Sequence, residues 1–62
     1  MKMYIARNKS GELWLHKEKP SLSISGKVFT SGLFGDFFNI DDNLFPEVTF
    51  ENSPREVELK LI

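Results

Sequence analysis

The chain has 62 residues, a net charge of −1 and no cysteine, so disulfides, thiolate metal sites and thiol nucleophiles are excluded. A chain this short forms one domain at most, and such a domain buries only about 60% of its unfolded surface, which leaves its stability marginal. No apolar run is long enough for a signal peptide or a membrane span, so we expect a single cytoplasmic domain over residues 1–62.

Residues 2–18 predict a β-hairpin. Polar and apolar residues alternate over residues 2–6 and again over 12–16, which is the period of a strand with one buried face. The polar stretch between them ends in Gly11, which can take the positive φ that a tight turn requires. The alternation separates aliphatic from aromatic side chains, with Met3, Ile5, Leu13 and Leu15 on one face and Tyr4, Trp14 and His16 on the other.

The middle of the chain predicts two or three short strands. Pro20 ends the second strand, because proline has no N–H to give to a ladder. Residues 21–26 alternate weakly, which fits either a short edge strand or an extended loop. Residues 27–30 and 36–40 are rich in β-branched and aromatic residues and predict two further strands, with the loop 31–35 between them.

The last third of the chain predicts one helical turn and two strands. Asp41 and Asp42 can cap a turn near residues 41–45, and Pro46 keeps it short, so a 3₁₀ turn is expected there. Residues 47–51 and 56–61 alternate cleanly and predict strands, separated by a turn at 52–54.

Five or six short strands joined by turns favour an all-β fold. We expect a single antiparallel sheet, curled or closed into a small SH3-like barrel that limits exposed edges. The predicted core is one set of inward apolar side chains: Met3, Ile5, Leu13, Leu15, Val28, Phe38, Ile40, Leu44, Phe45, Val48, Phe50, Val57, Leu59 and Leu61.

Charge is distributed unevenly along the chain. Residues 1–30 carry six basic and two acidic side chains, a net charge of +4, whereas residues 31–62 carry two basic and seven acidic ones, a net charge of −5. Pairing of basic with acidic strands across the sheet is favoured over a dipolar surface that orients a partner.

No set of residues predicts catalysis, a metal site or a cofactor. His16 is the only histidine, and no nucleophile or orienting acid is specified around it, so a surface position is favoured over a general base. Asp41 and Asp42 suit capping better than metal binding, because DDNLFPE lacks the alternating oxygen ligands and central glycine of a calcium loop. We therefore expect a protein that is not an enzyme.

The leading functional hypothesis is a protein-interaction module. Leu33, Phe34 and Phe37 have no assigned place in the core, because Phe37 and Phe38 point to opposite faces of one strand. They either close an open end of the barrel, the commoner outcome, or remain exposed for a protein partner or a second copy of the chain. Residues 31–37 or an open strand edge would then form the interface.

Single-stranded nucleic-acid binding is the alternative hypothesis. Tyr4, Trp14 and His16 on one sheet face, with Lys17 and Lys19 nearby, could stack on unpaired bases. The mildly acidic composition argues against this function. We favour a simpler arrangement in which Tyr4 and Trp14 pair across the hairpin and cover a minor cluster.

Two stretches resemble a known group of sequences. NLFPEVTFENSPREVELKL, residues 43–61, and MYIARNKSGELWLHKEKP, residues 3–20, are similar to the ends of short uncharacterised proteins of bacterial and phage genomes. Together they cover well over half of the chain. The resemblance implies a small protein of unknown activity, of the kind carried on mobile DNA, and it transfers no functional residue.

Overall fold

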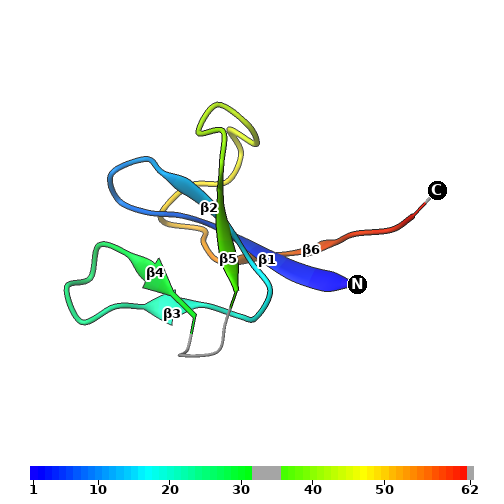
Figure 1. The fold of residues 1–62 in the computed structure, drawn as a ribbon. Coiled ribbons are helices and arrows are strands. Elements are labelled where there is room, and N and C mark those ends of the chain that lie inside the picture. The colour runs from blue at the N-terminus through cyan, green and yellow to red at the C-terminus, as the bar shows by residue number, and fades with distance from the viewer. Residues whose placement is uncertain (32–35, 62) are drawn as a thin grey trace.

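Two antiparallel sheets make up the fold in the computed structural model, which describes residues 1–31 and 36–61 (Figure 1). The larger sheet has the strand order β5-β2-β1-β6: Phe37–Ile40, Leu13–His16, Lys2–Arg7 and Arg55–Glu58. The smaller sheet pairs β3, Ser21–Leu22, with β4, Phe29–Thr30. The mainly β prediction is confirmed, but the single sheet closed into an SH3-like barrel is wrong. The larger sheet stays open because β5 and β6, its two edges, do not pair with each other.

The β1–β2 hairpin forms where the sequence predicts it. The Asn8 N–H donates to the Glu12 carbonyl over 2.8 Å, and Gly11 takes a φ of 100°, which suits glycine because it has no Cβ. Ile5 lies opposite Leu15 in the resulting ladder. The register sets Tyr4 opposite His16 and Trp14 opposite Ala6, so Tyr4 and Trp14 are diagonal neighbours across the hairpin.

One face of the larger sheet carries the main core. Ile5, Leu13 and Val48 are buried there, and further apolar side chains pack against them: Leu15, Ile40 and Val57. Val48 belongs to the segment of the chain that joins β5 to β6. This segment therefore covers the core face of the larger sheet. The predicted core is confirmed for Met3, Ile5, Leu13 and Val48, while Leu15, Ile40, Phe50 and Val57 are half-buried.

The remaining predicted core residues are exposed, and this part of the prediction is wrong: Val28, Phe38, Leu44, Phe45, Leu59 and Leu61. They belong to the β5 edge, to turns, or to the segment after β6, which leave them beside solvent. The last ladder bonds join Met1 to Leu59, at 2.8 and 3.0 Å. Beyond them the C-terminal segment runs past the sheet, and Leu61 is fully exposed (Figure 1).

The smaller sheet is tied to the turn of the β1–β2 hairpin. The buried Asn8 side chain accepts the Phe29 N–H at 2.8 Å, and the Lys9 N–H donates to the Lys27 carbonyl at 3.0 Å. Ala6 is fully buried on the face of the larger sheet opposite the main core. The β1–β2 hairpin is therefore buried on both faces, which period-two alternation cannot reveal.

A single arginine organises the segment between β5 and β6. The Arg7 guanidinium donates to the carbonyls of Gly11, Asp42, Leu44, Phe45 and Val48 at distances of 2.6–3.3 Å. The Leu44 N–H donates to the Asp41 carbonyl at 3.0 Å, but Phe45 takes a φ of 49°, outside the helical range. The 3₁₀ turn predicted near residues 41–45 is accordingly wrong, and the segment consists of separate turns instead.

Asp41 and Asp42 do bind backbone N–H groups, although no helix follows them. The Asp41 carboxylate accepts the Asn43 N–H at 2.9 Å, and the Asp42 carboxylate accepts the Leu13 N–H at 3.1 Å. The first contact is an Asx turn, two residues along the chain, and the second ties this segment to β2.

Residues 47–51 form no strand, contrary to the prediction. The Thr49 N–H donates to Asn52 Oδ1 at 2.8 Å, and the Asn52 N–H donates to Thr49 Oγ1 at 3.2 Å. The Asn52 amide also donates to the Glu47 carbonyl at 2.8 Å. Side chains thus satisfy backbone groups that a strand would need for its ladder. Phe50 is half-buried and packs on Phe29, with ring centroids 5.7 Å apart.

Candidate functional site

Strand β5 is an open edge of the larger sheet. Its pairing with β2 sets Phe37 opposite His16 and Phe38 opposite Leu15, and no described strand pairs with its other side. The four residues from Phe37 to Ile40 span about 13 Å at roughly 3.3 Å per residue. The strand therefore offers a short stretch of backbone that an additional strand could join.

The direction of the free backbone groups follows from one hydrogen bond. In an antiparallel ladder, hydrogen-bonded residue pairs alternate with non-hydrogen-bonded ones. The Lys17 N–H donates to the Asp36 carbonyl at 2.9 Å, so Lys17 and Asp36 are a hydrogen-bonded pair. Backbone groups of an antiparallel strand alternate between its two sides, so those of Phe38 and Ile40 also point toward β2. The N–H and C=O groups of Phe37 and Asn39 consequently point outward, at the free edge.

The side chains of this edge are apolar and unusually exposed. Phe37 is 52% exposed and Phe38 is 56% exposed, and the strand directs them to opposite faces of the sheet. Phe37 is held by an edge-on contact with Trp14, with ring centroids 5.4 Å apart, and by a tilted contact with His16 at 5.8 Å. A strand that joined β5 would meet a phenyl ring on each face.

Of the three predicted partner-binding residues, only Phe37 can be placed. Leu33 and Phe34 lie outside the described residues, so their prediction stays untested. The sequence predicts Phe38 in the core because it shares a face with Ile40. The predicted face is correct, but Phe38 is exposed and not buried. Its exposure follows from the edge position of β5, which depends on strand order rather than on local alternation.

His16 is buried, so its predicted surface position is wrong. Its side chain is 1% exposed, and Nδ1 lies 3.2 Å from the Ser31 hydroxyl oxygen. Nε2 has no hydrogen-bond partner among residues 1–31 and 36–61, and burial lowers the pKa of His16 below its ordinary value. A serine–histidine pair needs an acid on the second ring nitrogen to orient the ring, and the described residues place none there.

The residues of the nucleic-acid hypothesis do not form one open surface. Tyr4 and Trp14 are half-buried, and the indole Nε1 of Trp14 is buried without a hydrogen-bond partner in the described chain. Lys17 and Lys19 are exposed. With His16 buried, at most two aromatic rings of this group can meet a base.

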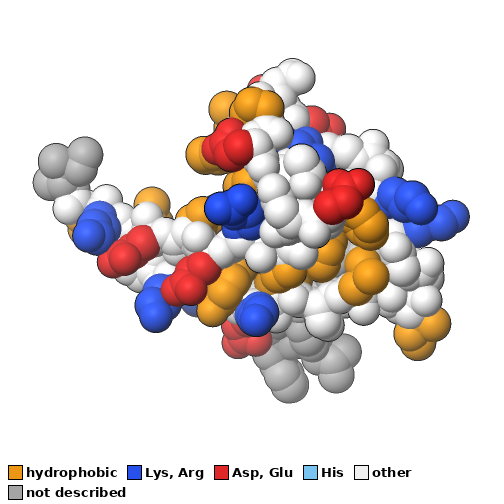
Figure 2. Space-filling model, turned by 180° about the vertical axis from the view of Figure 1, so that it is seen from behind, with side chains coloured by type: hydrophobic (Ala, Val, Ile, Leu, Met, Phe, Trp, Pro, Cys, Tyr) orange, Lys and Arg blue, Asp and Glu red, His pale blue; other side chains and the backbone are white. Residues whose placement is uncertain are grey.

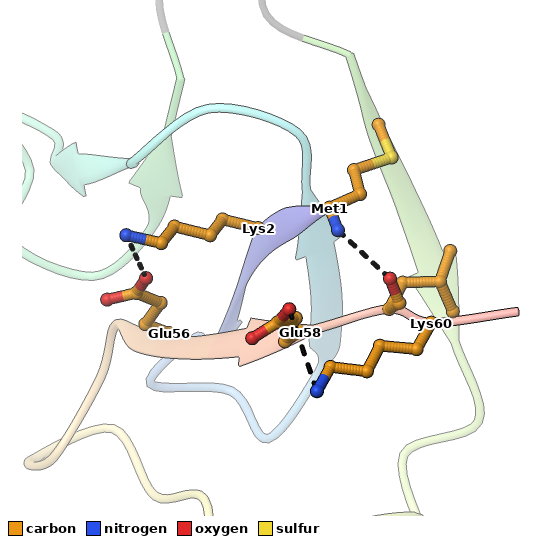
Figure 3. A network of polar contacts seen from close by, with 6 residues as sticks. Met1, Lys2, Glu56, Glu58 and Lys60 are labelled. Carbon is orange, nitrogen blue, oxygen red and sulfur yellow. Dashed lines mark hydrogen bonds and ion pairs between the residues drawn. The ribbon is translucent and has the colours of Figure 1, made fainter.

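Strand β6 is the other edge, and it carries charge where β5 carries phenyl rings. Met1 and Leu59 form a hydrogen-bonded pair, so alternation directs the backbone groups of Glu56 and Glu58 outward. Lys2 Nζ lies 3.4 Å from Glu56, and Lys60 Nζ lies 4.0 Å from Glu58 (Figure 3). Figure 2 shows basic and acidic side chains following one another along this projecting part of the molecule.

A shallow hollow of about 460 Å³ lies at the hairpin turn, lined by Lys9, Ser10, Lys27 and Val28. The Ser10 hydroxyl donates to the Glu12 carboxylate at 3.1 Å, which places a negative charge beside the two lysines.

The described residues contain no group of three or more His, Asp or Glu side chains placed to hold a metal ion, and no helix among them is long and apolar enough to cross a membrane.

No protein-family model matches this chain, and neither a curated protein nor a solved structure does so. The resemblance to short bacterial and phage proteins therefore stays a prediction.

Proposed function

We propose that this protein is a non-enzymatic protein-interaction module that binds an extended protein segment along the free edge of β5. One observation carries this proposal. The free edge of β5 combines outward backbone groups, at Phe37 and Asn39, with two half-exposed phenyl rings. Backbone hydrogen bonds would supply general affinity, and the contacts of alternate side chains would supply selectivity, as in other cases of strand addition.

The two phenylalanines divide the recognition between the faces of the sheet. Phe37 is fixed by Trp14 and His16, so it offers a rigid ring on one face. Phe38 lies opposite Leu15 on the other face. Successive side chains of an added strand alternate between these faces, so apolar residues at neighbouring positions of that strand would each meet one ring.

The experiment is selection of short peptides from a displayed library on the wild-type protein, followed by binding measurements on two variants. Asn39→Pro removes an outward N–H without removing a backbone ladder bond between β5 and β2. Asn39→Ala is the matched control, because both variants lose the side-chain bond to the Leu13 carbonyl, 3.1 Å long. Selected peptides should bind the wild type and Asn39→Ala but lose about tenfold or more in affinity for Asn39→Pro.

Two results would contradict the proposal. One is a set of peptides whose affinity is the same for Asn39→Pro and Asn39→Ala. The other is a well-sampled selection that yields no binder. Amide exchange gives a second check, because a bound strand should slow exchange at Phe37 and Asn39 more than at any residue of β6.

A further inference from the structure

We propose that the natural occupant of the β5 edge is a second copy of this chain, paired antiparallel so that Phe38 of each copy lies opposite Phe38 of the other. This inference rests on the proposed function and specifies its partner. The result would be a two-fold symmetric dimer with one continuous sheet, in which both β6 strands remain at the outer edges.

The free backbone groups of β5 are complementary to themselves. They belong to Phe37 and Asn39, which lie one position to either side of Phe38. In an antiparallel pair with Phe37 opposite Asn39 of the second copy, each N–H meets a C=O, and the two-fold axis repeats the arrangement. Every outward donor and acceptor of the strand is then satisfied.

The same register brings the exposed rings together. Because the backbone groups of Phe38 point toward β2, the two Phe38 residues form a non-hydrogen-bonded pair across the interface, in which side chains approach most closely. Aromatic pairs in this position contribute about 0.2–1 kcal/mol relative to alanine. Phe37 lies beside Asn39 of the second copy on the opposite face.

Charge selects this register over its neighbour. With Phe37 opposite Asn39, Asp36 lies opposite Ile40 of the second copy, and no two carboxylates face each other. A shift that pairs Asn39 with Asn39 would set Asp36 opposite Asp42, and like charges directly opposite are destabilising. A shift the other way, with Phe37 opposite Phe37, leaves the Asn39 backbone groups without a partner in β5 of the second copy.

The contact is small, so the dimer should be reversible. A phenylalanine buries about 150–250 Å² when fully covered, and the two on each copy are only about half exposed. Together the four rings lose a few hundred Å², well below the roughly 1,000 Å² of a stable interface. We therefore expect monomer and dimer to exchange over an accessible range of concentration, and the charged β6 edge to stop growth beyond the dimer.

The test uses two variants that introduce opposite charges at Phe38, with self-association measured by analytical ultracentrifugation. The wild type should shift from monomer to dimer as its concentration rises. Phe38→Glu and Phe38→Lys should each weaken self-association by about tenfold or more, since each puts like charges opposite one another. Mixing the two variants should restore a one-to-one complex, because glutamate then faces lysine across the axis.

The control is Leu59→Glu, which changes an equally exposed apolar residue next to β6 and should leave self-association unchanged. A wild type that stays monomeric at every concentration would overturn the inference, and so would variants that fail to recover on mixing while each remains folded by circular dichroism. If the mixed variants fail but selected peptides still distinguish Asn39→Pro from Asn39→Ala, only the second-copy inference falls. If the peptides fail as well, the proposed function falls with it.

Discussion

The two edges of the larger sheet are built from opposite kinds of residue. β5 consists of Phe37, Phe38, Asn39 and Ile40 and carries no charge, whereas β6 carries Arg55, Glu56 and Glu58 around a single valine. Charged side chains along an edge strand oppose pairing with another chain, and exposed aromatic ones do not. Both edges have outward backbone groups, so the difference in side chains decides which edge is available for binding.

The edges also differ in what holds them. β6 is joined to β1 along its whole length, and the ladder continues as far as Met1 and Leu59. β5 is followed directly by the segment that Arg7 holds through its guanidinium group. The β5 edge therefore depends on one partly buried polar network, and the charged edge depends on regular strand pairing.

The largest expected effect is the loss of that network. Arg7→Met should lower the free energy of unfolding by roughly 3 kcal/mol, because several carbonyls lose their donor and part of the network is buried. Urea denaturation followed by Trp14 fluorescence would measure the change. The matched control is Arg55→Met, which removes an exposed arginine from β6 and should change stability by no more than about 0.5 kcal/mol.

Equal effects of Arg7→Met and Arg55→Met would contradict the stated dependence of β5 on the arginine network. For Arg7→Lys we expect an intermediate loss in the free energy of unfolding, because an ammonium keeps the charge but cannot reach as many carbonyls as a guanidinium fork. Such a result would show that β5 depends on the shape of the guanidinium group as well as on its charge.

The next effect is the conversion of β6 into a second adhesive edge. The double variant Glu56→Val and Glu58→Val removes its acidic side chains and leaves its outward backbone groups in place. We expect the weight-average molar mass to rise above that of the wild type at equal concentration, because both edges can then pair and growth is open-ended. Light scattering over a concentration series measures this directly.

Glu51→Val is the control for that experiment, since Glu51 is an exposed acid in a turn and not in a strand. If the control raises the molar mass as much as the double variant does, then general loss of charge is the cause. The difference in side chains between the two edges would then not explain which edge pairs with another chain.

Local pattern accounts for much of the fold. The hairpin and the strand at Phe37–Ile40 follow from alternation and turn residues, whereas Val48 is buried although the strand predicted around it does not form. Alternation also puts Arg7 on the same face as Ile5, and a charged residue on an inward face predicts a buried set of partners. That signal was present in the sequence, and it points to the network that replaces the expected 3₁₀ turn.

Strand order could not be predicted in the same way. Whether Phe38 is buried or exposed depends on which strand lies next to β5, and this is set by contacts between residues distant in the sequence. The same holds for His16, whose burial requires Ser31 and Phe37 to be brought against it. The candidate site is thus defined by the edge of the sheet, and no motif of the chain marks it.

Acid should weaken the β5 side of the sheet before the β6 side. Burial holds the pKa of His16 below its ordinary value of 6.5, so the unfolded chain binds a proton more readily than the folded chain does. This contribution to stability is fully present above about pH 6.5 and is lost as the pH falls toward the folded-state pKa. Because His16 touches Phe37, the protection of β5 amides against exchange should fall first.

A comparison of protection factors, which correct for the intrinsic pH dependence of amide exchange, at neutral and mildly acidic pH checks this order. His16→Gln, which cannot titrate, should remove the difference between the two strands. A uniform loss of protection over β5 and β6 in the wild type would show that protonation acts on the whole sheet.

The smallest expected effect is at the ion pair beside β6. Lys2 and Glu56 are 3.4 Å apart, but their side chains are 74% and 52% exposed, so water screens the attraction. Exposed pairs of this kind contribute about 0–1 kcal/mol, and Lys2→Ala should therefore lower the free energy of unfolding by a few tenths of a kcal/mol. The effect should disappear in high salt. A loss as large as that for Arg7→Met would mean that charge pairing, and not the ladder with β1, holds β6 in place; the charges would then stabilise that edge as well as protect it.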